Sequence, residues 1–328
     1  MRSPALPARL VQRCVLCLLL AVAGLAQAAA PRHWTIVDLG GEDYGTHANA
    51  VNNRGEVSGW FYVFDPAPWH HAFVWSNGTM QDLGAPQGNH SSNAQGMNNH
   101  GLIAGDGDNG IALVWDNGQW IPLGVRGAAN DANEGGTVVG SYWAGTQTHC
   151  FTYRDGALQD IGTLGGGDCV AWAVNNGGLV TGYSYIAGST TLHAFVYQGG
   201  TMQDLGTLGG RSSYAFDVND NGTVVGAAED ATGRLVAMIY DSTGMRPLFD
   251  LPGNHAARAI NNRGDVIGSF DNGSFLYEGG AVTRLESIPE VTAAGWTRLS
   301  PVGINDRGWI VGVGSRNGVG RSFLLKPQ

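Results

Sequence analysis

Three features of the sequence predict an all-β fold, a seven-bladed β-propeller of four-stranded blades. A turn motif, Asn-x-x-Gly followed by a short apolar run, occurs seven times at spacings of 35 to 46 residues. Asn-Gly, Asp-Gly and Gly-Gly pairs separate short runs that alternate or are rich in valine, as two-residue hairpins require. After residue 28 there is no apolar period of 3.6 residues, which helices would show. Four strands in each unit of about 42 residues are typical of propeller blades.

The composition supports a packed protein with many turns. The chain has 328 residues, of which 52 are glycine and 10 are tryptophan, and 43% are hydrophobic. The glycines follow no Gly-X-Y period, which excludes a collagen helix, and the hydrophobic fraction excludes a disordered chain. We therefore expect the glycines to lie at repeated turns.

The first 28 residues predict a secretory signal peptide. A basic start precedes an apolar run over 15–25, and Ala26-Gln27-Ala28 is a small-x-small cleavage site. A lipoprotein signal at Cys17 is the rival interpretation, although Leu16 is not the small residue that such processing needs. We expect residues 29–328 to form one secreted domain, in the periplasm or outside the cell, with no membrane span.

The order of strands within a blade follows from side-chain size. The run before each turn asparagine carries small residues at alternate positions, such as Ala48 and Ala50, which suits the crowded axis. We expect this run to be the inner strand, followed outward by the Val-Val-Gly, His-Ala-Phe and Asp-Leu-Gly runs. The chain starts with an outer-type run at 35–39 and ends with an inner set at 300–325. The N-terminal outer strand should therefore complete the C-terminal blade, which removes exposed sheet edges.

The repeated runs resemble a known family. His71-Ala72-Phe73, His193-Ala194-Phe195, the run Met202–Gly210 and Val224-Val225-Gly226 are similar to the bacterial extracellular HAF repeat. The resemblance covers nearly all of the chain after the signal peptide. It implies secretion and repetition, and it supplies no catalytic residue.

Polar residues that recur in the units are expected to be architectural. The seven turn asparagines should cap the turn between the first two strands by bonding to nearby backbone. The recurring aspartates and histidines, exemplified by Asp82 and His71, should also be structural, because a catalytic site is used once. Asp217-x-Asn219-x-Asn221-Gly222 matches half of a calcium loop, but Ala228 stands where the bidentate glutamate should be.

Charge and cysteine content limit the partners. The net charge is −9, and removal of the three signal-peptide arginines would make it −12. An acidic surface repels phosphates, so nucleic acid and anionic membranes are not expected partners. Cys150 and Cys169 remain after cleavage, and a disulfide between them is predicted if their Cα atoms lie within about 7 Å. We expect a monomer without a cofactor, with calcium or a transition metal as an open alternative.

Loops that depart from the repeat mark a candidate ligand site. They fall on an arc over the predicted blades 6, 7, 1 and 2, on the face where the outer-to-inner connections lie. The candidate ligand-binding residues are Asp43, Tyr44, His47, Trp69, His90, His255, Trp296 and Arg298. Aromatic and polar side chains together suit a sugar. The three histidines could instead bind a metal, or act with carboxylates as acid and base. A further alternative is that these loops have no function and vary in sequence because they are exposed to solvent.

The sequence thus predicts a secreted binding or interaction module for an extracellular glycan or other polymer. A propeller hydrolase or lyase acting on such a polymer is the first alternative. A structural protein of the envelope or matrix is the second. No catalytic residue is assigned, and binding is expected rather than catalysis.

Overall fold

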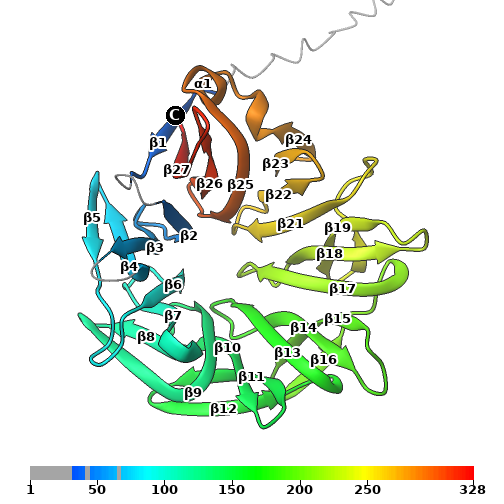
Figure 1. The fold of residues 1–328 in the computed structure, drawn as a ribbon. Coiled ribbons are helices and arrows are strands. Elements are labelled where there is room, and N and C mark those ends of the chain that lie inside the picture. The colour runs from blue at the N-terminus through cyan, green and yellow to red at the C-terminus, as the bar shows by residue number, and fades with distance from the viewer. Residues whose placement is uncertain (1–31, 41–44, 65–67) are drawn as a thin grey trace, which may run out of the picture. The chain divides into compact units, whose positions relative to one another are not determined.

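β-Sheets surround a central axis; each four-stranded sheet has one innermost strand, and a seven-stranded sheet contributes two (Figure 1). The structure is a computed structural model that describes residues 32–40, 45–64 and 68–328. One compact unit spans His33–Gln328. The predicted signal peptide, residues 1–28, lies outside the described residues and stays a prediction. The chain is an all-β propeller, as the sequence predicted.

Five of the sheets are separate four-stranded blades. The first blade contains β2 (Thr46–Val51), β3 (Val57–Phe64), β4 (Pro68–Ser76) and β5 (Thr79–Asp82). Another contains β13 (Gly165–Val174), β14 (Val180–Ile186), β15 (Leu192–Gln198) and β16 (Thr201–Asp204). The next contains β17 (Gly209–Val218), β18 (Val224–Asp230), β19 (Leu235–Asp241) and β20 (Gly244–Pro247). It is followed by β21 (His255–Ile260), β22 (Val266–Phe270), β23 (Gly273–Glu278) and β24 (Ala281–Arg284).

The last blade joins the two ends of the described chain. It contains β25 (Trp296–Ile304), β26 (Ile310–Arg316), β27 (Val319–Pro327) and, as its outer strand, β1 (Trp34–Asp38). The register of β1 on β27 runs antiparallel from Trp34 opposite Pro327 to Asp38 opposite Phe323. The N-terminal strand therefore covers the edge that β27 would otherwise expose.

The sixth sheet has seven strands and corrects the predicted count of blades. It contains β6 (Ser92–Met97), β7 (Ile103–Gly107), β8 (Ile111–Asp116), β9 (Gln119–Ala132), β10 (Val138–Ala144), β11 (Gln147–Arg154) and β12 (Ala157–Gly162). The first half of β9 pairs with β8 and its second half pairs with β10. We expected seven separate four-stranded blades, and the structure has five together with this fused sheet. The cause is the shortest repeat spacing, 35 residues between Asn98 and Asn133, which leaves no connecting loop and keeps the chain extended.

The core lies between neighbouring sheets. The phenylalanine of the His-Ala-Phe run is fully buried wherever it occurs in the repeat, at Phe73, Phe151, Phe195, Phe275 and Phe323. Burying a side chain of this size stabilises the fold by about 1.5–3 kcal/mol. The repeated motif is therefore the unit of packing between the sheets.

Short helices occur in two connections of the described chain. They are the 3₁₀ turns η1 (Asp108–Gly110) and η2 (Leu285–Ser287) and the α-helix α1 (Pro289–Ala293). Val291 of α1 is buried in a core cluster with Trp34 and Trp296. Among the described residues, no helix is long and apolar enough to cross a membrane.

Candidate functional site

The seven turn asparagines form a closed ring at one end of the central channel. Each turn is capped by its own asparagine: in the first, Asn52 Oδ1 accepts hydrogen bonds from the N–H groups of Arg54 and Glu56, both at 3.0 Å. This confirms the predicted capping role. Each asparagine also donates from Nδ2 to the backbone oxygen of the next asparagine around the axis, closing with the bond from Asn305 to Asn52 at 2.8 Å. The same residue therefore shapes a turn and ties two neighbouring inner strands together.

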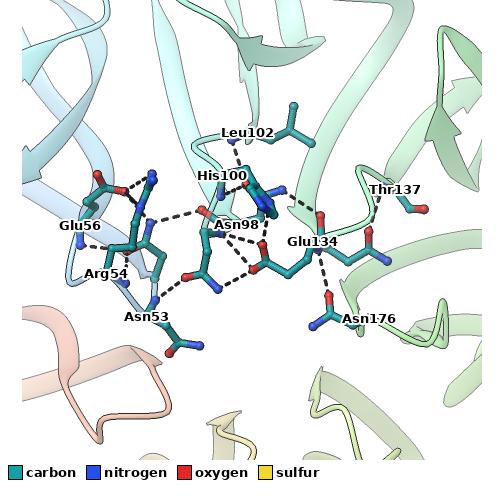
Figure 2. Close-up of polar contacts among 12 residues, drawn as sticks. Asn53, Arg54, Glu56, Asn98, His100, Leu102, Glu134, Thr137 and Asn176 are labelled. Atoms are coloured by element: carbon teal, nitrogen blue, oxygen red, sulfur yellow. Dashed lines mark hydrogen bonds and ion pairs between the residues drawn. The ribbon is translucent and has the colours of Figure 1, made fainter.

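A second ring is formed by the residue that follows each asparagine. Its members are Asn53, Asn99, Glu134, Asn176, Asp220, Asn262 and Asp306. Each accepts, on a side-chain oxygen, a hydrogen bond from the backbone N–H of its predecessor in the ring. Figure 2 shows part of this ring, in which Glu134 donates from its backbone N–H to Asn176 and contacts His100 at 3.0 Å. Every member is committed to its neighbour, so the ring is a structural element.

Side chains three residues before each turn asparagine line the central channel. In chain order they are Asn49, Gln95, Asn130, Trp172, Phe216, Arg258 and Val302. They line a cavity of about 530 Å³. The set is asymmetric, since the amides come from β2, β6 and β9 and the aromatic rings from β13 and β17.

The two halves of the channel present different chemistry. Asn49 and Asn130 each donate from Nδ2 to a backbone oxygen of the next inner strand, at 2.8 and 2.7 Å, so both amides are held in place. Trp172 is 37% exposed although it lies on an inner strand. Arg258 lies over the ring of Phe216 at 4.8 Å, a cation–π contact. Among the described residues, Arg258 has no carboxylate partner.

Two carboxyl groups also lie along this channel. Asp131 and Asp217 occupy the position two before the turn asparagine, which is alanine or glycine in the other inner strands. Burial raises the pKa of Asp131 from 3.8 to about 6, and burial together with the charge of Asp131 raises the pKa of Asp217 to about 7. Each accepts a backbone N–H from the next inner strand, of Val174 at 3.0 Å and of Ile260 at 2.8 Å. Burial thus brings the pKa of both groups closer to neutral pH than that of an exposed aspartate.

Part of the predicted loop site is present at the surface. His47 stacks on Trp60, with ring centres 4.0 Å apart, and burial lowers its pKa. Trp69 stacks on His90 at 4.4 Å. Asp43 and Tyr44 lie outside the described residues. Arg298 is exposed in β25.

Two other predicted site residues belong to the interior, which corrects the proposed arc. Trp296 is 1% exposed and packs edge-on against Phe323 in the core. His255 is 2% exposed; its Nδ1 accepts from the N–H of Ala237 at 2.8 Å and its Nε2 donates to the oxygen of Leu251 at 3.1 Å. Because both ring nitrogens are used, His255 has none left for a ligand. In residues 32–40, 45–64 and 68–328 no three His, Cys, Asp or Glu side chains form a group that could hold a metal.

The repeated histidines and aspartates pair with each other. His71 bonds to Asp82 at 3.0 Å, and the pairs His149–Asp160 and His193–Asp204 are both 2.8 Å apart. The aspartate also accepts the N–H of a glycine two residues later, as Asp82 does from Gly84. These contacts join the two outer strands of a blade, the architectural role expected of them.

Cys150 of β11 and Cys169 of β13 form a disulfide. Their Cα atoms are 5.3 Å apart, inside the limit set from the sequence. The bond links the fused sheet to the β13–β16 blade.

The channel residues were not among the residues that the sequence singled out. The sequence feature that could have identified them is the variable residue three positions before each turn asparagine, in strands that are otherwise alike. The loops differ from one unit to the next in length. Trp172, Phe216 and Arg258 differ from the other units only in the side chain at the position three residues before the turn asparagine.

Comparison with known proteins supports the fold. No family model and no curated protein matches the chain. Oligogalacturonate lyase from Vibrio parahaemolyticus is similar in structure, with a TM-score of 0.57, 10% identity, and coverage of 90% of this chain and 96% of that one. An oligogalacturonate lyase in complex with manganese has a TM-score of 0.57, 12% identity and coverage of 91% and 97%. The propeller domain of the Trilobed protease from Pyrococcus furiosus has a TM-score of 0.54, 10% identity and coverage of 86% and 95%. At this identity, the likeness establishes a β-propeller and nothing about activity.

Proposed function

We propose that this protein is a secreted propeller that binds an extracellular glycan in its central channel. The observation that carries the proposal is the asymmetric channel, in which Trp172 and Phe216 face a set of fixed amides and Arg258 has no carboxylate partner among the described residues. A sugar ring has an apolar face that stacks on aromatic rings and hydroxyl groups that bond to amides and guanidinium. The predicted signal peptide and the disulfide support an oxidising, extracytoplasmic location.

The test is calorimetric titration of the mature protein with neutral and acidic oligosaccharides. We expect Trp172→Ala to weaken glycan binding about tenfold or more, because the stacking surface is lost. Arg258→Ala should weaken acidic sugars more than neutral ones. Trp69→Ala is the matched control, since Trp69 lies in the loop cluster that the sequence favoured. Loss of binding in Trp69→Ala, with Trp172→Ala unchanged, would move the site to those loops.

A lyase or hydrolase is the second candidate, and the carboxyls of Asp131 and Asp217 favour it. A general acid or base works best with a pKa near the working pH, and both pKa values are raised toward neutrality. If the protein cleaves a polysaccharide, Asp131→Asn or Asp217→Asn should abolish release of new chain ends while glycan binding remains. Cleavage at the wild-type rate by both variants would exclude this pair as catalysts. A structural role in the envelope or matrix predicts no glycan binding at all.

A further inference from the structure

A second aromatic cavity lies between the fused sheet and the β13–β16 blade. It has a volume of about 260 Å³. Trp143 and Thr148 come from the β10–β11 hairpin on one side, and Tyr183 and Tyr185 from β14 on the other. We call this cavity the Trp143 groove.

The exposure of Trp143 is unusual for a residue of its size. It is 57% exposed, and Trp172 of the channel is 37% exposed; in the described chain these two are the tryptophans that stand out to solvent. Tryptophan is enriched at binding interfaces, because its ring offers a large apolar face and a polar N–H group. One of the two lies in the groove and the other in the channel.

A chain of ring contacts joins the groove to the channel. Tyr183 of the groove packs edge-on against Tyr214 at 5.2 Å, and Tyr214 is parallel to Phe216 at 6.3 Å. Phe216 in turn makes the cation–π contact with Arg258. A series of ring contacts therefore leads from the groove to the channel.

Polar groups accompany the rings of the groove. A neighbouring depression is lined by Trp143, Tyr142 and Arg126. Arg126 donates from Nε to the backbone oxygen of Asn109 and, among the described residues, has no carboxylate partner. A guanidinium group therefore lies beside Trp143, next to the groove.

The two sides of the groove are held together before any ligand arrives. Cys169 lines the groove and is bonded to Cys150 of the opposite side. Asp168 accepts from both the N–H and the hydroxyl of Thr148, at 2.7 and 3.0 Å. A site built in advance loses little freedom on binding, which favours affinity.

We infer that the Trp143 groove is a second subsite for the glycan bound in the channel, so that the ligand is an extended oligosaccharide lying along this series of rings. This inference rests on the proposed function and adds to it the length of the ligand. A single sugar unit would occupy the channel alone. A longer chain would occupy both places, and its affinity would rise with length.

The experiment is calorimetric titration of the mature protein with two series of one to six sugar units, cello-oligosaccharides and oligogalacturonates. We expect the affinity of the wild type to rise about tenfold or more from the shortest to the longest ligand of the preferred series. Trp143→Ala should abolish this rise, and Trp143→Phe should restore part of it. Trp172→Ala should lower the affinity at every length. Ile121→Ala removes an exposed side chain outside the groove and channel and should change nothing.

The outcomes separate the two proposals. If Trp143→Ala and Tyr185→Ala both bind the six-unit chain as the wild type does, while Trp172→Ala does not, the inference is overturned and the channel proposal stands. If neither series binds to the wild type at any length, both are overturned. Melting curves of each variant exclude unfolding as the cause of a lost affinity.

Discussion

At the scale of single residues, the channel carboxyls couple stability to pH. Asp131 and Asp217 replace small residues and have raised pKa values, so the folded chain holds their protons more tightly than the unfolded chain does. Below about pH 4 both states are protonated and there is no penalty. The penalty grows as the pH rises from about 4 to about 6 for Asp131 and from about 4 to about 7 for Asp217, and is complete above those values.

Replacing either carboxyl by an amide should therefore stabilise the protein only at higher pH. We expect Asp217→Asn to raise the free energy of unfolding by about 1–3 kcal/mol at pH 8 and by little at pH 4. Asp131→Asn should behave in the same way. Urea unfolding at pH 4, 6 and 8 measures the effect, with Asp155→Asn as a control because that side chain is 90% exposed. An equal change at all three pH values would contradict the assignment.

The buried asparagine ring leads to a second prediction at this scale. Asn175 is 6% exposed; it donates to the oxygen of Asn219 at 2.9 Å and accepts the N–H of Leu179 at 2.9 Å. Asn175→Ala leaves the buried N–H of Leu179 without a partner, while the oxygen of Asn219 keeps only its bond from the N–H of Gly222, and the change should cost about 1–3 kcal/mol. The exposed neighbour Asn176 provides the comparison, since Asn176→Ala should cost less than about 1 kcal/mol. Similar losses of unfolding free energy in both variants would show that the inner ring contributes no more to stability than the outer one.

At the scale of elements, each second strand approaches the inner strand very closely at one glycine. A Cβ atom there would clash with a backbone oxygen of the inner strand, and this holds at Gly59, Gly105, Gly140, Gly182, Gly226, Gly268 and Gly312. Beside these glycines the pairing register shifts, as at a β-bulge. The glycine of the Val-Val-Gly run is thus required by the approach of two strands.

Substitution of one such glycine should be severe. Gly226→Ala would place its Cβ against the oxygen of Tyr214 and the Cα of Ala215, and should destabilise the fold by about 3 kcal/mol. Gly320 of β27 has no atom near the position of a Cβ, so Gly320→Ala should lie within about 0.5 kcal/mol of the wild type. Thermal or urea unfolding of the two variants measures the difference. Comparable stability would refute the close approach.

At the scale of the whole unit His33–Gln328, closure depends on contacts far apart in sequence. Two hydrogen-bonded rings run through every inner turn, and β1 completes the last blade by pairing with β27. The core of that blade includes Trp34 of β1 together with Phe323 and Leu325 of β27. The two ends of the unit His33–Gln328 therefore share one core.

Removing β1 should open this closure. A chain beginning at Gly40 exposes the edge of β27 and part of its core, so we expect a melting temperature lower by roughly 10 °C or more, with aggregation. A chain beginning at Ala29, the predicted mature start, is the control and should match the full-length protein. Calorimetry and size-exclusion chromatography report the two effects. A Gly40 chain that melts like the control would contradict the role given to β1.

How much could be predicted depended on whether a feature is repeated. The capping role of the turn asparagines, the closing strand and the disulfide were predicted, because the asparagine turns and strand runs recur in the sequence and only two cysteines remain after residue 28. The fused sheet was not predicted, although the short spacing between Asn98 and Asn133 is visible in the sequence. The residues of β9 do not reveal whether the connection between two units stays extended or forms a turn. The prediction that His255 binds a ligand was also wrong. In the fold, His255 accepts the N–H of Ala237. Ser92 and Ser213 accept the N–H groups of Ala72 and Ala194 at the same position of their units.

The sequence by itself determined the all-β class, the periodic turns and the joining of the two ends, because these depend on backbone preferences and apolar periodicity along the chain. Only the tertiary structure decided which side chains face the channel. A shift of register before each turn reorients the last residues of every inner strand, and closure of the ring then brings Trp172, Phe216 and Arg258 opposite amides from distant strands. The candidate site arises from that meeting of separate strands, which no single stretch of sequence contains.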